Sequence, residues 1–288
     1  MTFKNLKEKC NYYRDLSDVR LVPNSYVLVM LDGHSFSQKI KKRFKLPFDD
    51  TFIKLVNDTA CYVAKQVQSV KFGYVQSDEM SFVLSDFSED EGAKDSFFSY
   101  RLEKLCSIIS GFATSYFNRE MDKLFIREMG LVSPVGEEVL KMLDTKTLFE
   151  FDCKAWNVPS KNEVFAWMLY RQNDCIRNSK EAVAQTYLPK KSLHGLTCDE
   201  QLKRVLDEKG IDWNDFSDDK KYGRFIYKET EDKIATYNGK NVQYQRTVWK
   251  AHDAFPLNGS NEEKNTEDEV KSSIKEKFWS ICQVPTLQ

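Results

Sequence analysis

Three features are scarce in this 288-residue chain: long apolar runs, an excess of charge of one sign, and closely paired cysteines. No uncharged apolar run approaches about 18 residues, so we expect no membrane-spanning segment. Lys+Arg (43) and Asp+Glu (44) nearly balance, and the net charge of −1 argues against long-range steering of an anionic partner. Any nucleic-acid surface must therefore arise from local clusters of basic residues.

The seven cysteines are scattered, odd in number and never spaced as C-x-x-C. This pattern argues against a zinc site or a disulfide framework and predicts a reducing compartment. The first 16 residues carry charges of both signs and lack an apolar segment, so no secretory signal is expected. We predict a cytoplasmic protein, with a mitochondrial location left open.

Two acidic turns that follow apolar runs are the most informative feature. Residues 26–31 read as a buried strand that ends abruptly at Asp32-Gly33. Downstream, Asp78 and Glu79 occupy a tight turn between two strand-like runs, residues 67–74 and 80–84. Apolar residues at helical spacing connect the two regions, and Asp49 or Asp50 is the expected helix cap. The pattern predicts a β-α-β arrangement with a carboxylate at each turn.

The remaining chain completes a mixed α/β (α+β) prediction. We expect a second long helix over 98–116, an irregular connection over 130–147, a strand over 151–158 and a helix capped by Asn162. Asn238-Gly239, flanked by apolar runs, predicts a hairpin. We place a first domain at 1–190 and a C-terminal extension, packed on it, at 191–288. Within the extension, 259–277 is expected to be mobile or a loosely attached helix.

Asp32 and Asp78 are the candidate metal ligands. Either one alone is as readily an ordinary turn residue. Together, after neighbouring strands, they suit magnesium, which takes one or two protein carboxylates and completes its shell with water and phosphate oxygens. Two such ions can activate a hydroxyl and stabilise a leaving oxygen in phosphoryl transfer. Gly33 adds a backbone group that no side chain obstructs, and Glu79 is the third candidate catalytic carboxylate.

Two further segments are candidate phosphate contacts. The turn His34-Ser35-Phe36-Ser37 can cradle a triphosphate with its backbone amides, although an ordinary loop explains it equally well. The basic segment 39–45 follows directly, which favours Arg43 or Lys45 as a phosphate ligand. In the polar cluster 171–179, arginines with Asn178 suit a phosphate or nucleotide; an exposed helix face is the alternative.

These residues resemble the tRNA-His guanylyltransferase family, including its 3′-to-5′ polymerase-like members. The matching motifs occur in order over roughly residues 5–230. They are Leu31-Asp32-Gly33-x-x-Phe36, Pro47-Phe48-Asp49-x-x-Phe52, Gly73-Tyr74-x-Gln76-Ser77-Asp78-Glu79-x-Ser81-Phe82, Phe151-Asp152-x-Lys154 and Arg171-Gln172-x-Asp174.

The resemblance implies a polymerase-type palm domain with an antiparallel sheet, and two Mg²⁺ ions on Asp32, the Gly33 backbone and Asp78. It implies activation of a tRNA 5′-monophosphate by ATP, attack by the 3′-hydroxyl of an incoming ATP or GTP, and a homotetramer. The implied nucleotide-binding residues are Gly33, His34, Ser35, Phe36, Ser37, Lys45, Asp49, Gln76, Ser77 and Asn178. The candidate RNA or phosphate contacts are Lys42, Arg43, Lys154, Arg171, Asp174 and Arg177.

The departures from the family pattern separate its branches. Met30 and His34 stand where the family usually has arginine, and Leu46 replaces a basic residue, with Lys45 as a substitute. Lys154 replaces another arginine. The block Ile176-Arg177-Asn178-Ser179 resembles the polymerase-like branch, which repairs 5′-truncated tRNAs by copying the opposite strand.

We therefore expect a template-directed nucleotidyltransferase that repairs or edits tRNA 5′ ends. The alternative within the family is addition of G at the −1 position of tRNA-His. Outside that activity, the sequence also permits a catalytically weak tRNA-binding protein that retains the palm, or a palm enzyme acting on small triphosphates.

Overall fold

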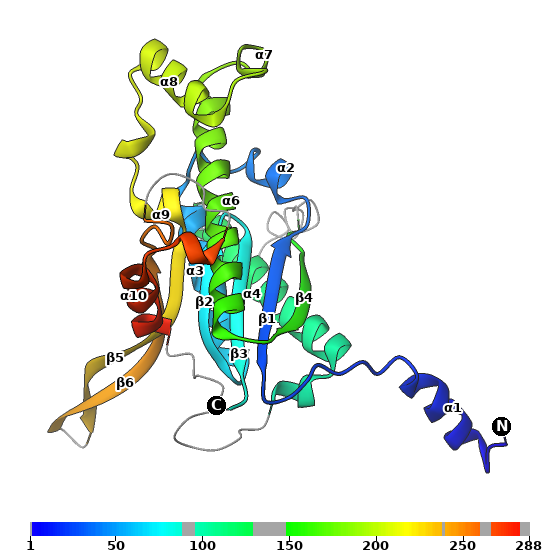
Figure 1. Cartoon of the computed structure of the whole chain (residues 1–288). Helices are drawn as coiled ribbons and strands as arrows, with labels where there is room; N and C mark the ends of the chain where they lie inside the picture. The colour runs from blue at the N-terminus through cyan, green and yellow to red at the C-terminus, as the bar shows by residue number, and fades with distance from the viewer. Residues whose placement is uncertain (1, 88–95, 129–147, 238–239, 260–265, 283–288) are drawn as a thin grey trace.

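The computed structural model describes residues 2–87, 96–128, 148–237, 240–259 and 266–282 (Figure 1). Within these ranges the centre of the molecule is an antiparallel six-stranded sheet with the strand order β4-β1-β3-β2-β5-β6. The strands are β1 (Tyr26–Gly33), β2 (Val70–Gln76), β3 (Glu79–Ser85), β4 (Phe151–Val158), β5 (Arg224–Tyr237) and β6 (Lys240–Asp253).

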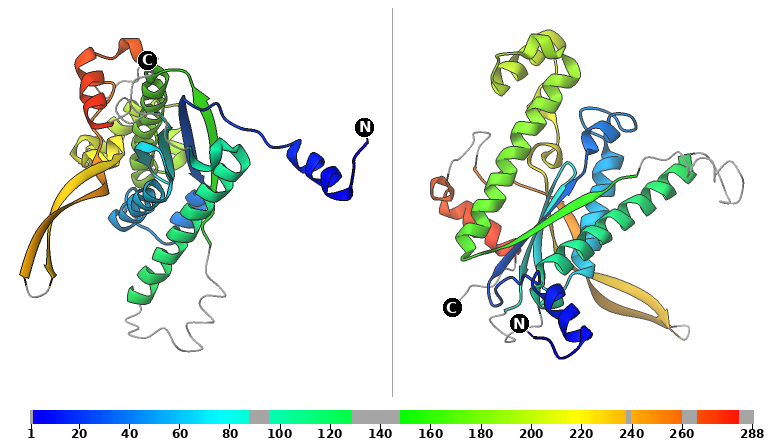
Figure 2. Two further views of the ribbon diagram at one scale, coloured as in Figure 1. Left: turned by 90° about the horizontal axis from the view of Figure 1, so that it is seen from below. Right: turned by 90° about the vertical axis from the view of Figure 1, so that its right-hand side faces the viewer.

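Helices cover both faces of the sheet, and two apolar cores result (Figure 2). Helices α3 (Asp50–Gln66) and α4 (Leu102–Glu128) lie on one face, and α6 (Lys161–Tyr187) with α10 (Ser272–Cys282) lies on the other. Because side chains alternate along a strand, Val27 and Val29 of β1 enter the first core and Leu28 enters the second. This explains why β1 reads as one continuous apolar run.

Shorter elements complete the described chain. They are α1 (Leu6–Asp15), α2 (Phe36–Ile40), η1 (Phe97–Tyr100), α7 (Lys190–Leu193), α8 (Cys198–Lys209), η2 (Trp213–Asp215), α9 (Asp218–Tyr222) and η3 (Glu267–Glu269). Helix α1 has no buried residue and projects away from the body of the molecule (Figure 1). None of the described helices combines the length and the apolar character needed to cross a bilayer.

The predicted fold class is confirmed: the structure is a mixed α/β, palm-like fold. The connection between the two acidic turns is the helix α3. Asp49 rather than Asp50 caps it, because its carboxylate accepts hydrogen bonds from the amides of Thr51 and Phe52. Strands β1 and β2 are not neighbours, since β3 returns between them. That return brings the turn after β2 beside the end of β1.

Other local predictions need correction or extension. The long helix over 161–187 is capped by Ser160 rather than Asn162, because the Ser160 hydroxyl accepts from the amide of Glu163. The hairpin exists, but its strands β5 and β6 are 14 residues each and so much longer than the flanking apolar runs. Its Asn238-Gly239 turn and the predicted connection over 130–147 lie outside the described residues.

The C-terminal part shares the sheet with the N-terminal part, because β5 pairs with β2 through Gly73–Val75 and Arg224–Ile226. The division at residue 190 stays a prediction. Within 259–277, positions 260–265 lie outside the described residues, and the rest contains η3 and the start of α10. Phe278 of α10 is fully buried against the sheet and α6, with its ring centroid 5.2 Å from those of Phe72 and Phe165.

Phe278 thus gives a test of how firmly α10 is attached. We expect Phe278→Ala to lower the free energy of unfolding by about 3–5 kcal/mol, because a buried ring is replaced by a cavity. Guanidinium unfolding followed by circular dichroism measures it. The control is Tyr13→Ala on α1, where the side chain is 58% exposed and little change is expected. If Phe278→Ala changes the free energy of unfolding as little as Tyr13→Ala does, the packing of α10 does not contribute to stability.

Candidate active site

The site forms where the turn between β2 and β3 meets the end of β1. Gln76 pairs with Glu79, so Ser77 and Asp78 alone make the turn, and Ser77 has a positive φ of 44°. A Cβ atom added to Gly33 would lie 2.5 Å from Oδ2 of Asp78 and 2.5 Å from the ring of Phe36. The carboxylate of Asp78 therefore rests against the Gly33 backbone, and only glycine allows this approach.

The electrostatics of Asp32 and Asp78 fit a cation. Burial raises the pKa of Asp78 to about 6; a hydrogen bond from Ser77 opposes the rise, and the charge of Asp32 adds to it. Burial also raises the pKa of Asp32, as does Asp152, its neighbour across the β1–β4 pair. Within the described residues neither Asp32 nor Asp78 forms an ion pair. A bound cation would stabilise both carboxylates, because the charges of Arg171 and Lys154 only partly offset the rise in the pKa of Asp32.

The donor set suits magnesium better than zinc or calcium. Among the described residues, no group of three or more His, Cys, Asp or Glu side chains converges as a metal-binding cluster. A cation held here would have two carboxylates and the Gly33 backbone as protein ligands, with other oxygens from water or phosphate. That division of ligands is the usual one for magnesium. The roles of Asp32, Gly33 and Asp78 as metal ligands remain a prediction.

Glu79 differs from the other two carboxylates because both of its oxygens are engaged. Arg171 of α6 donates from Nε to Oε1 at 2.6 Å and from Nη2 to Oε2 at 2.5 Å. The third nitrogen, Nη1, donates to Asp174 at 2.7 Å, and Arg177 pairs with the same aspartate. Arg171, Asp174 and Glu79 are buried. The group therefore joins α6 to β3, and the predicted RNA contacts of these α6 residues stay predictions.

A cavity of about 250 Å³ lies beside the acidic turn. Six residues predicted for nucleotide binding line it, namely Ser37, Lys45, Asp49, Gln76, Ser77 and Asn178. They come from the segment after β1, the start of α3, the β2–β3 turn and α6. The structure thus brings together side chains that are as many as 141 positions apart (37 to 178). The lining combines the basic side chains of Lys41, Lys45, Lys220 and Arg224 with amide and hydroxyl groups, a set suited to phosphate and base recognition.

Among the lining residues that the sequence did not single out are two basic ones, Lys220 of α9 and Arg224 of β5. Arg224 opens β5 and is buried; its Nε donates to Asn57 at 2.8 Å, and its Nη1 donates to the carbonyl of Asp219. Burial lowers the pKa of this guanidinium. No local signal marks either position: Arg224 reaches the cavity because β5 pairs with β2, and Lys220 belongs to α9, which directly precedes β5.

The remaining predicted residues lie around the site rather than in the cavity. His34 and Ser35 are exposed in the turn after β1, and Ser35 begins α2 with a positive φ of 57°. Phe36 is buried against Phe117, Phe149 and Phe151, so its ring belongs to the core.

The basic candidates are dispersed. Lys42 is exposed, and Arg43 pairs with Glu128 at 3.0 Å. Lys154 is exposed opposite Met30 on β4, and its charge lowers the pKa of Asp32 in part. Of these three, Lys154 alone acts electrostatically on the acidic site.

Comparison with known proteins gives a family match. The family model described as "tRNAHis guanylyltransferase" matches residues 7–159. An uncharacterized protein, R259, of Acanthamoeba polyphaga mimivirus is 25% identical over 230 residues, which cover 78% of this chain and 76% of that protein. A probable tRNA(His) guanylyltransferase of Bos taurus is 28% identical, with 73% of this chain and 65% of that protein covered. The match to tRNA(His) guanylyltransferase 2 of Arabidopsis thaliana covers 39% of that longer protein.

Solved structures support the same relationship. A bacterial tRNA(His) guanylyltransferase-like protein in complex with ATP matches with a TM-score of 0.67 and 27% identity, over 77% of this chain and 88% of that chain. The corresponding protein in complex with GTP matches with a TM-score of 0.62 and 25% identity, over 87% and 92%. Since the family model spans just over half of the sequence, the chain belongs to the tRNAHis guanylyltransferase family, a family of tRNA 5′-end nucleotidyltransferases.

Proposed function

We propose that this protein adds nucleotides to the 5′ end of tRNA, directed by the opposite strand, after activation of that end with ATP. The observation that carries the proposal is the placement of Asp78 against Gly33, at the rim of a cavity that Ser77 and Asn178 line. The acidic pair and the cavity share one two-residue turn. A nucleotide in the cavity is thereby held next to the two carboxylates.

Asp32, the Gly33 backbone and Asp78 are the residues that would hold Mg²⁺. Two such ions, when bound, activate an attacking hydroxyl and neutralise charge that develops on the phosphates. The protein's own contribution is to keep the two carboxylates close in a partly buried turn, so that little rearrangement is needed during the reaction.

The cavity residues divide the recognition of a nucleoside triphosphate. Lys45 offers a positive charge for the phosphates, and the exposed hydroxyl of Ser37 offers a donor, while the hydroxyl of Ser77 already donates to Asp78. Asp49 and Asn178 lie on other parts of the lining and suit the base or ribose. The ATP and GTP complexes of the bacterial relatives support both nucleotides as ligands here.

Glu79 is a positioning residue in this proposal rather than a direct proton carrier. Its oxygens accept two hydrogen bonds from Arg171. A charge pair of this kind fixes geometry well but costs much if one partner is removed, because the other is left buried and unpaired. The pair sets the distance between α6, which carries Asn178, and the acidic turn.

Repair of truncated 5′ ends is the preferred assignment within the family. The block Ile176–Ser179 lies on α6, and both Asn178 and Ser179 line the cavity. The residues that separate the two branches of the family are thus in a position to affect nucleotide selection. Assembly as a homotetramer is retained as part of the proposal.

The metal ligands are tested by Asp32→Asn and Asp78→Asn. Either change should reduce nucleotide addition at least about 10²-fold, because charge stabilisation in the transition state is lost. Independently of activity, Mg²⁺ should raise the melting temperature of the wild type but not of either variant. Asp15→Asn on the exposed helix α1 is the matched control. Full activity or an unchanged Mg²⁺ shift in both variants would rule out the site.

The raised pKa of Asp78 predicts a pH dependence in metal-free buffer. Its folded pKa of about 6 exceeds the ordinary value of 3.8, so its contribution to stability is complete below pH 3.8 and is lost as the pH rises through 6. Relative to Asp78→Asn, the wild type should lose up to about 3 kcal/mol of unfolding free energy over that window. Urea unfolding from pH 4 to 7.5 measures the difference. Parallel curves for the two proteins would contradict it.

Substrate choice separates the two branches. We expect a 5′-monophosphorylated tRNA that lacks its first nucleotide to be extended faster than intact tRNA-His, with all four nucleotides, ATP and Mg²⁺ present. The added nucleotide should follow the opposing base when that base is changed. Faster extension of tRNA-His, with G added whatever the opposing base, would assign the protein to the guanylyltransferase branch instead.

A further inference from the structure

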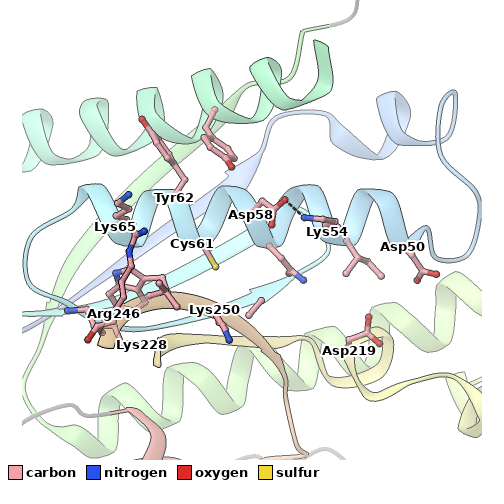
Figure 3. Close-up of a pocket in the computed structure, with 17 residues that line it drawn as sticks. Asp50, Lys54, Asp58, Cys61, Tyr62, Lys65, Asp219, Lys228, Arg246 and Lys250 are labelled. Carbon is pink, nitrogen blue, oxygen red and sulfur yellow. Dashed lines mark hydrogen bonds and ion pairs between the residues drawn. The ribbon is translucent and has the colours of Figure 1, made fainter. Parts of the chain in front are cut away.

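A second hollow, separate from the acidic turn, runs along helix α3. It has a volume of about 810 Å³ and lies between α3 and the β5–β6 hairpin (Figure 3). Residues from successive turns of α3 form one wall, including Lys54, Asn57, Cys61 and Lys65, and residues 246–251 of β6 form the other. We call this hollow the α3–β6 groove.

The groove joins the nucleotide cavity at one end. Ile53 and Asp219 line both hollows. Asn57 of the groove accepts a hydrogen bond from Arg224, which lines the cavity. A polymer with its terminal nucleotide in or near the cavity can therefore continue into the groove without crossing the body of the protein.

The charges of the groove are divided between its two ends. Asp50 and Asp219 lie toward the cavity, and Lys65, Lys228, Arg246 and Lys250 gather at the other end (Figure 3). The acidic side is largely neutralised, since Asp50 pairs with Lys220 and Asp58 with Lys54. On the cationic side Lys250 pairs with Glu229 and Glu231, whereas Lys65, Lys228 and Arg246 form no ion pair within the described structure. For a chain with a net charge of −1, this is a local excess of positive charge.

Aromatic rings accompany these cations. Tyr62 and Tyr116 stack with centroids 4.3 Å apart, and the guanidinium of Arg119 lies 4.8 Å from the Tyr116 ring. Trp249 lines the groove with Lys228 at 5.2 Å from its ring. The three rings are only partly buried. Cations for phosphates beside accessible rings for bases are the combination that binds single-stranded nucleic acid.

We propose that the α3–β6 groove binds a single-stranded segment of the RNA substrate, with the phosphates at Lys65, Lys228 and Arg246 and the bases against the aromatic rings. The proposal rests on the proposed function, because it takes the RNA as the substrate of the neighbouring cavity. A single strand is favoured over a duplex, since stacking on protein rings requires unpaired bases.

Fluorescence anisotropy with a labelled single-stranded RNA, and with the same sequence as a duplex, tests the groove. The double variant Lys65→Glu/Arg246→Glu should bind the single strand at least about tenfold more weakly at low salt. The slope of log K against log salt should fall by about 0.7 for each lost phosphate contact. Tyr116→Ala should lose about tenfold through lost stacking. Lys203→Glu on α8, an exposed lysine remote from the groove, is the matched control for the charge change.

The outcomes separate this inference from the proposed function. Melting temperatures confirm that each variant is folded, and ATP binding should be unchanged because the cavity is intact. The proposal is overturned if the groove variants bind RNA as tightly as the wild type. If they also change native mass in light scattering, the groove is instead an interface between copies of this chain. If the wild type adds no nucleotide yet the variants lose RNA, the groove stands and the proposed function fails. If the wild type adds nucleotides but the groove variants bind RNA as well as it does, the groove proposal fails and the proposed function stands.

Discussion

The approach of the Asp78 carboxylate to the backbone of Gly33 is the contact on which the site depends. It requires a two-residue turn between β2 and β3, a neighbouring strand that ends at the same level, and no side chain at position 33. Each requirement has a separate physical source. The β2–β3 turn depends on its own residues alone. The pairing of β1 with β3 places the end of β1 beside that turn, and the absence of a side chain depends only on Gly33. Loss of any one of them would separate the two carboxylates.

The buried arginine network extends this constraint to the other layer of the molecule. Arg171 reaches from α6 to Glu79 at the start of β3, and Asp174 holds the same guanidinium. The geometry of the pair repays the cost of burying charge only when every nitrogen and oxygen is satisfied. Helix α6 is therefore held in one position over the sheet, and its polar residues Asn178 and Ser179 reach the cavity from that position.

The local parts of the fold were predictable from the sequence. Apolar runs ending in Asp32-Gly33 and at Ser77-Asp78 gave the strands and the turns, and helical spacing gave α3 between them. The cap of α6 was misplaced by two residues, because Ser160 and Asn162 are both good cap formers and only the backbone conformation decides. Of the six predicted cavity residues, Ser37, Lys45 and Asn178 were candidates from their local sequence, and Asp49, Gln76 and Ser77 were named for nucleotide binding through the family resemblance. Their convergence was not visible in any local pattern.

What the sequence did not reveal is non-local. The position of Arg224 depends on the pairing of β5 with β2, and the α3–β6 groove depends on a hairpin far longer than its apolar signal. Solvent-exposed strand residues such as Arg246 do not show the alternation that identifies a half-buried strand. The cations of the α3–β6 groove therefore come together only in the folded chain, and no sequence motif marks them.

Asp49 carries a final implication. One of its oxygens holds the first turn of α3 through the amides of Thr51 and Phe52, and the other accepts from the amide of Lys45, while the residue also forms part of the cavity wall. Selectivity for the bound nucleotide and the integrity of the helix start are thus encoded by a single side chain. A substitution of Asp49 that alters ligand preference would therefore also disturb the start of α3, whereas Asn178 of α6 lines the same cavity without capping that helix.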